Sequence, residues 1–392
     1  MYDFDRLIDR RTTGSIKWQR YPQEVLPLWV ADMDFPAPAP VRAALQRCLD
    51  HGVFGYEAPS RRLAETVAAR LERLYGWKVD PQAVIATPGV IAGFSAAART
   101  VCAPGEGVVV QPPVYPPFLK LDLAGLTVQH APLRRADADG QVHYALERDA
   151  FRGAFHSGAA RSRMFLLCNP HNPTGQVYSR AELEFMVDTC LGEEAILCSD
   201  EIHSELLLGE ARHLPAATLS PGIEMRSITL IAPSKTFNVP GLFCAFAIVP
   251  DESLRRRFAH TAESLAMHIN SLGLAAAEAA FSGECDDWLA ALRSYLTANR
   301  NFLFDFVREN LPGVRMTLPQ ATYLAWLDCG ELQRSGRISG TPYQFFLKQA
   351  KVALNEGREF GPGGENFVRL NFGCPRATLE QALLRIQTAL GI

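Results

Sequence analysis

The sequence predicts an α/β protein with two lobes: a larger lobe with a mostly parallel seven-stranded sheet between helices, and a smaller α/β lobe. From about residue 80 to 250, seven short apolar or β-branched runs alternate with amphipathic segments. A helical pattern follows over about 251–311, and mixed helix and strand patterns run from 314 to the end. Apolar strands that alternate with helices favour a parallel sheet covered on both faces.

The seven predicted strands are short and rich in Val, Ile, Leu and Phe, and they lie at 83–87, 107–111, 127–131, 163–168, 195–199, 227–232 and 243–249. Helical spacing of apolar residues predicts helices over 90–101 and 180–191. In the smaller lobe we expect strands at 322–328 and 367–373. The expected domains are a small one, made of residues 1–46 with a proline-rich arm and residues 286–392, and a large one of residues 47–285.

Composition and charge exclude several classes of protein. The 392 residues carry a net charge of −3, so the basic excess of a nucleic-acid binder is missing. No run approaches the roughly 20 apolar residues of a membrane span, and the first 14 residues have no apolar signal-peptide core, so we expect a cytoplasmic protein. Nine scattered cysteines, an odd number without a CxxC pair, argue against disulfides and a zinc site, and no metal is expected.

The residues that directly follow the strands are the candidates for ligand binding, because open parallel sheets bind ligands beyond the carboxyl ends of their strands. After the first strand, Gly89, Val90 and Ile91 form a glycine turn that opens a helix, and free amide groups at a helix start suit a phosphate. After the second strand, a proline-rich loop fixes the ring of Tyr115. A simple turn and a loop-packing aromatic are the ordinary alternatives.

Later strands are followed by further polar residues. Asn172 lies in an Asn-Pro loop after the fourth strand, and Asp200 ends the fifth, where a carboxylate in an anion-binding crevice requires a cationic partner such as a protonated ring nitrogen. Ser234 and Lys235 follow the sixth strand. Desolvation lowers the pKa of a lysine in such a place and frees its amine for Schiff-base chemistry. The alternatives are a turn, a helix-capping aspartate and a surface lysine.

Together these signals describe a site for pyridoxal 5′-phosphate (PLP). The site contains a phosphate cradle to which Ser234 adds a donor, an aromatic plate, an amide for the phenolic oxygen, a carboxylate for the ring nitrogen and an imine-forming lysine. Lys235, Asp200 and Tyr115 are then the catalytic candidates, and Asn172 tunes the phenolic oxygen. Five such residues in order after successive strands are a much stronger signal than any one of them.

These residues resemble the aspartate-aminotransferase superfamily, fold type I of the PLP enzymes, over almost the whole chain. Within it the chain is most similar to the MalY/PatB-type cystathionine β-lyases, which are bacterial carbon–sulfur lyases. The resemblance is carried by IKW (16–18), LPLWVADMDF (26–35), VFGYE (53–57), PPVYPPF (112–118), NPHNPTG (169–175), SDEIH (199–203), SKTFNVPGL (234–242), ATYLAWLD (321–328) and VRLNFGCPR (368–376).

The resemblance implies an α,β-elimination that cleaves cystathionine or related cysteine thioethers to a thiol, pyruvate and ammonia. It implies that Arg369 and Asn172 bind the amino-acid substrate, Arg369 through its α-carboxylate. Ala31 and Asp32 would line the substrate entrance, with Tyr323 as a further substrate contact.

The resemblance also implies a homodimer with shared active sites, in which Tyr56 reaches the cofactor phosphate of the neighbouring subunit. His203 would then lie near the cofactor and support Asp200. An equally good alternative is a buried histidine that makes its hydrogen bonds within the core and has no role at the cofactor.

One departure concerns the phosphate. Aminotransferases of this fold usually place an arginine eight residues after the lysine, and here that position is Phe243. We therefore expect this chain to release PLP more readily than arginine-bearing relatives, and equilibrium dialysis measures this. Equally tight retention would contradict it.

Two other functions stay open at this point. One is a class I/II aminotransferase, because the same lysine can return the proton to the cofactor instead of losing a leaving group. The other is a regulatory protein that keeps the fold and binds a protein partner, since fold does not fix function.

Overall fold

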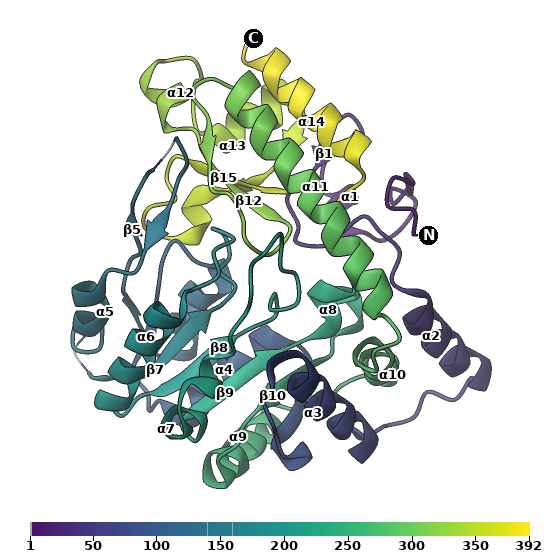
Figure 1. Cartoon of the computed structure of the whole chain (residues 1–392), viewed down its shortest axis with the longest axis vertical. Coiled ribbons are helices and arrows are strands. Elements are labelled where there is room, and N and C mark those ends of the chain that lie inside the picture. The colour runs from purple at the N-terminus through teal and green to yellow at the C-terminus, as the bar shows by residue number, and fades with distance from the viewer. Residues whose placement is uncertain (1, 139, 159) are drawn as a thin grey trace.

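The computed structural model describes residues 2–138, 140–158 and 160–392. Its largest sheet has seven strands in the order β2-β10-β9-β8-β7-β3-β4 (Figure 1). Strand β10 is antiparallel to both of its neighbours, and the other neighbouring pairs are parallel, which confirms the predicted mostly parallel sheet. The strands are β2 (Val84–Thr87), β3 (Gly107–Val110), β4 (Thr127–His130), β7 (Ser162–Cys168), β8 (Ile196–Asp200), β9 (Ser227–Ile231) and β10 (Ala245–Ile248).

Both faces of this sheet are covered by helices. Along β7, Met164 and Leu166 pack on one face, and Phe165 and Leu167 pack on the other, as the two-residue period of a strand requires. The first face is covered by α4 (Val90–Val101) and α9 (Glu252–Ser264), and the second by α5 (Arg148–Ala154) and α6 (Arg180–Gly192). The helices predicted at 90–101 and 180–191 are therefore confirmed.

A second, four-stranded sheet forms the smaller α/β lobe, and Figure 1 shows it with α11 and α14 above the first sheet. Its order is β11 (Arg315–Met316), β12 (Leu324–Asp328), β15 (Phe367–Asn371) and β14 (Asn355–Glu356), and all neighbours are antiparallel. Arg369 on β15 pairs with Trp326 on one side and with Asn355 on the other, so it lies inside this sheet. Helices α11 (Asp286–Asn310), α12 (Gly330–Arg334), α13 (Pro342–Phe345) and α14 (Arg376–Ala389) complete the lobe.

The helical pattern at 251–311 is divided into three helices, α9, α10 (Ser271–Phe281) and α11. The first break ends where Asn270 caps α10, its side-chain oxygen accepting the Gly273 N–H at 2.7 Å. The second lies at Gly283, whose φ of 101° suits glycine. Helix α10 packs against α2 (Ala39–His51) and α3 (Arg61–Tyr75). Apolar spacing alone did not reveal these breaks.

The proline-rich arm connects the two sheets. After α1 (Ile16–Gln19), strand β1 (Leu26–Pro27) pairs in parallel with β13 (Val352–Ala353). The arm then passes Asn371, whose side-chain amide donates to the carbonyls of Val30 at 2.6 Å and Asp32 at 2.7 Å. This path brings residues 29–35 to the carboxyl ends of the first sheet. The domain boundaries proposed from the sequence stay a prediction.

The loop at 169–175 also joins the sheets. The Gly175 carbonyl accepts the N–H groups of Gln320 at 2.8 Å and Ala321 at 3.0 Å. At a φ of 72°, a Cβ on Gly175 would lie only 2.5 Å from Pro319 Cβ, so this approach requires glycine. The loop therefore holds Asn172 between the two sheets.

None of the helices in the described part of the chain combines the length and apolar character needed to cross a bilayer. The nine cysteines are free thiols.

Candidate active site

A cavity of about 500 Å³ lies where the parallel strands end. It brings together residues that follow five different strands, together with Ala31 of the arm. The predicted residues that line it are Ala31, Gly89, Val90, Ile91, Tyr115, Asn172, Asp200, His203, Ser234 and Lys235. Cys168, Ile202 and Phe243 also line it. The spacing of polar residues after the strands therefore predicted a real cluster in space.

Lys235 lies on the short helix α8 (Pro233–Thr236), directly after β9. Its Nζ donates to the Ala31 carbonyl at 2.6 Å. Burial, with a smaller contribution from the charge of Arg369, lowers the pKa of Lys235 to about 8 against the opposing charges of Asp32 and Asp200. About one amine in ten is therefore neutral at pH 7, far more than for a lysine with its usual pKa, and this suits both covalent attachment of an aldehyde and proton transfer.

Asp200 ends β8 and is only 3% exposed. Burial raises the pKa of Asp200 to about 7, and the neighbouring Glu201 adds to this rise. The Ile202 N–H, donated to Asp200 Oδ1 at 3.1 Å, and the charge of Lys235 both oppose it. Because the described chain leaves this carboxyl poorly compensated, it suits a ligand with a protonated ring nitrogen.

Arg369 of the second sheet does not line the cavity itself but contacts Asn172, which does. Its guanidinium donates to Asn172 Oδ1 at 3.0 Å, to Asn355 Oδ1 at 2.6 Å and to the Trp29 carbonyl at 3.1 Å. Its buried Nε has no hydrogen-bond partner among the described residues. Burial lowers the pKa of Arg369 to about 10, so it remains a cation at neutral pH. This planar cation with an unused donor suits a carboxylate.

The first turn of α4 faces the same cavity. Gly89 caps this helix without a side-chain acceptor, so the first N–H groups have no partner within the helix. No atom lies within 4 Å of the place where a Gly89 side chain would begin. Together with Ser234, this start of a twelve-residue helix forms a cradle for a phosphate. Phe243, 64% exposed and with a φ of 46°, supplies an aromatic ring to the same cavity.

His203 and Tyr323 lie close together, with ring centroids 6.1 Å apart. His203 is 3% exposed, and among the described residues its Nδ1 has no hydrogen-bond partner. Burial and the charges of Lys235 and Arg369 lower the pKa of His203 to about 3, so it is neutral. A histidine with a purely structural role in the core would have a hydrogen-bond partner at Nδ1, whereas His203 lines the cavity. Tyr323 donates its hydroxyl to the Ala31 carbonyl at 2.9 Å.

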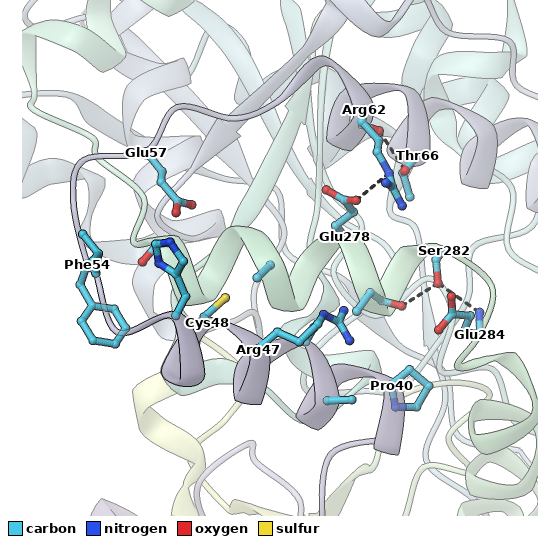
Figure 2. Close-up of a pocket in the computed structure, with 17 residues that line it drawn as sticks. Pro40, Arg47, Cys48, Phe54, Glu57, Arg62, Thr66, Glu278, Ser282 and Glu284 are labelled. Carbon is cyan, nitrogen blue, oxygen red and sulfur yellow. Dashed lines mark hydrogen bonds and ion pairs between the residues drawn. The ribbon is translucent and has the colours of Figure 1, made fainter.

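Four predicted residues are not among the described residues that line the cavity: Asp32, Tyr56, Arg369 and Tyr323. Arg369 and Tyr323 still contact its wall, through Asn172 and the Ala31 carbonyl. The Asp32 carboxylate contacts Arg10 at 2.8 Å and Lys17 at 3.5 Å instead of lining the cavity. Tyr56 is fully exposed in the segment 52–60, which connects α2 to α3. Figure 2 shows Phe54 and Glu57 of this segment beside a second groove, next to α2 and α10.

Sequence reasoning missed several residues that shape the site. Asn371 binds the arm from β15, two positions after Arg369, and the two-residue period of a strand could have placed both on one face. Asn238 donates to the carbonyls of Met33 and Phe35 at 2.8 and 2.7 Å. Phe360 lies under the Arg369 guanidinium, 5.0 Å from ring centre to Cζ. No helical or strand period in the sequence indicates a role for Asn238 or Phe360.

The residues present fit PLP. The cavity offers a phosphate cradle, an aromatic side chain at Tyr115, a buried carboxyl at Asp200 and an amine of lowered pKa at Lys235. A crystal structure of cystalysin from Treponema denticola, which contains a PLP cofactor, matches with a TM-score of 0.92 and 30% identity, over 100% of this chain and 99% of that one.

Fold and site together define an enzyme of PLP fold type I whose cofactor is pyridoxal 5′-phosphate. The chain belongs to the aminotransferase class I and II family, whose sequence profile matches residues 23–386.

Two curated relatives match over nearly their full lengths. Cystathionine β-lyase PatB of Bacillus subtilis is 38% identical over 395 residues, which cover 99% of this chain and 100% of that protein. The protein MalY of Escherichia coli is 32% identical over 402 residues, which cover 100% of this chain and 99% of that protein. The family resemblance inferred from the motifs is therefore confirmed.

Proposed function

We propose that this chain is a carbon–sulfur β-lyase of the cystathionine β-lyase type. In this proposal it cleaves cystathionine or related cysteine thioethers to a thiol, pyruvate and ammonia. The observation that carries it is a cavity lined by the Lys235 amine, the buried Asp200 carboxyl and Asn172, whose side-chain oxygen accepts the Arg369 guanidinium at 3.0 Å. The likeness to relatives named as cystathionine β-lyases supports elimination as the reaction.

Each residue has a distinct role in the proposed reaction. Arg369, held by Asn172 and Asn355, binds the α-carboxylate and so orients the amino acid. Lys235 removes the α-proton at its Nζ, for which a pKa of about 8 is well placed. When bound, PLP withdraws electrons from the α-carbon, and Asp200 keeps its ring nitrogen protonated. The bond from the β-carbon to sulfur then breaks, its electron pair leaves with the thiolate, and water hydrolyses the remaining three-carbon fragment to pyruvate and ammonia.

The test is incubation of the holoenzyme with L-cystathionine. We expect homocysteine and pyruvate in equal amounts, measured by a thiol reagent and by lactate dehydrogenase. L-Alanine, which has no leaving group at its β-carbon, is the matched control and should give no catalytic release of pyruvate. A cystathionine reaction without pyruvate would refute the substrate class.

An aminotransferase is the second candidate, because the family profile that matches the chain is named for that activity. The two differ in what happens to the cofactor. Stoichiometric conversion of bound PLP to its pyridoxamine form by amino acids alone would favour transamination, and a cofactor spectrum that returns to that of PLP once the amino acid is consumed would favour the lyase.

We also propose a homodimer in which the partner subunit's Tyr56 contacts the cofactor phosphate. In support, Tyr56 is fully exposed and lies near the exposed Val53 and Phe54, and an apolar surface of this kind is typical of a contact site. The oligomeric state of the holoenzyme in solution tests this part. The cytoplasmic location and a regulatory protein partner stay predictions.

A further inference from the structure

Four charged residues of the amino-terminal region form a cluster that we call the arm clamp: Arg10, Lys17, Asp32 and Asp34. Arg10 donates from one nitrogen to Asp34 at 2.7 Å and from the other to Asp32 at 2.8 Å. Lys17 donates to Asp34 at 2.7 Å and to the Asp32 carbonyl at 3.2 Å. The two cations and two anions therefore hold one short stretch of the arm at several points.

The arm clamp is largely buried. Lys17 is 1% exposed and Asp34 is 4% exposed. Burial alone would raise the pKa of Asp34, but Lys17, Trp18 and Arg10 outweigh it and hold the pKa below its usual value. Because desolvation offsets much of the attraction in a buried ion pair, such a pair is better explained by the one geometry it specifies than by added stability.

The stretch held by the clamp includes the residue that contacts the catalytic lysine. Ala31 directly precedes Asp32, and its carbonyl accepts the Lys235 amine at 2.6 Å and the Tyr323 hydroxyl at 2.9 Å. Of this stretch, Ala31 lines the cavity, whereas Arg10 and Lys17 are not among the described residues that line it. The clamp can therefore act on the cavity only through the arm.

We propose that Arg10 is a positioning residue for proton transfer, which holds the arm so that the Ala31 carbonyl orients the Lys235 amine. The proposal rests on Lys235 as the base of the proposed function. Arg10 is suited to this role because its fork spans both carboxylates at once, and a lysine at this position can reach only one of them. A small displacement of a reacting group lowers a rate strongly.

The test is exchange of the Cα hydrogen of L-alanine for deuterium in D₂O, catalysed by the holoenzyme and followed by NMR. In this exchange the Cα–H bond breaks, its proton passes to Lys235, and a deuteron from solvent returns to the carbon. We expect Arg10→Lys to lower the rate at saturating alanine by about tenfold and to leave KM within about twofold, because Arg369 has its own partners in Asn172 and Asn355.

Arg11→Lys is the matched control, because among the described residues Arg11 donates to the backbone carbonyls of Trp18, Gln23 and Val25 and to no member of the clamp. A lysine at position 11 also keeps the cation that lies over the Trp18 ring. It should exchange alanine at the wild-type rate. Arg10→Gln is measured in parallel as a second variant, and thermal unfolding establishes that each protein is folded. The proposal would be overturned if the folded Arg10 variants exchanged alanine at the wild-type rate. It would also be overturned if the Arg10 and Arg11 variants lost activity to the same extent.

Alanine exchange does not require cleavage of a carbon–sulfur bond. If the wild-type enzyme exchanges alanine but releases no pyruvate from cystathionine, the lyase assignment fails and the positioning role of Arg10 is still decided. If the wild-type enzyme exchanges no amino acid, the role of Lys235 as a base fails, and the positioning role fails with it.

Discussion

Replacing Lys235 with alanine is expected to abolish covalent attachment of PLP and to lower the rate of α-proton removal by about 10⁴-fold. The reason is that one amine both binds the aldehyde and carries the proton, and no second lysine lines the cavity among the described residues. Borohydride reduction followed by mass spectrometry measures the attachment, since reduction fixes the cofactor to the lysine that holds it. Alanine exchange in D₂O measures the proton transfer.

Lys78→Ala is a suitable control, because the Lys78 side chain is 82% exposed and its one ion pair within the described chain is with Glu72, at 3.7 Å. This variant should keep the cofactor mass after reduction and the wild-type exchange rate. A Lys235→Ala protein that retained the cofactor mass after reduction would show that another amine holds PLP.

Replacing Asp200 with asparagine is expected to stabilise the protein without its cofactor at high pH and to weaken cofactor binding. Its pKa of about 7 in the folded chain lies above the value of about 3.9 for an unfolded aspartate. A raised carboxyl pKa contributes stability that is fully present below about pH 4 and is lost as the pH rises through about 7. At pH 8 the difference corresponds to about 4 kcal/mol at most, and the asparagine variant avoids this loss.

The measurement is urea unfolding of both cofactor-free proteins between pH 4 and pH 8. The free energy of unfolding of the wild type should fall relative to that of Asp200→Asn as the pH rises. Added PLP should reverse the order, because a protonated ring nitrogen gives the Asp200 carboxylate its partner. Asp188→Asn, at an exposed position on α6, should leave the pH dependence of wild type unchanged. A difference between wild type and Asp200→Asn that did not vary with pH would contradict the raised pKa.

The fold and much of the site could be predicted because their signals are local and periodic. Strands with apolar residues on both faces, such as β7, look different in sequence from surface segments, and the polar residue after each strand is then easy to find. Parallel strands end at one edge, so Asn172, Asp200 and Lys235 meet there although 63 residues separate the first from the last.

The arm clamp could not be predicted in the same way. Arg10, Lys17, Asp32 and Asp34 lie in a largely irregular segment without a helical or strand period, and charged residues in such a segment are normally solvated. Only the packing of the arm against the second sheet makes Lys17 one of the most buried side chains in the described chain. The breaks between α9, α10 and α11 could not be predicted for a related reason. The start of α10 is fixed by the capping side chain of Asn270, which the spacing of apolar residues does not indicate.

Arg369 lies in a different sheet from Asp200, and Lys235 lies on the short helix that follows β9 of the Asp200 sheet. In the proposed reaction, the residues that activate the amino acid and the guanidinium that binds its carboxylate therefore belong to separate layers of the molecule, which are joined by the arm and by the loop around Gly175. Changes confined to the second layer can alter which amino acids are accepted while the redistribution of electrons in the first layer stays intact.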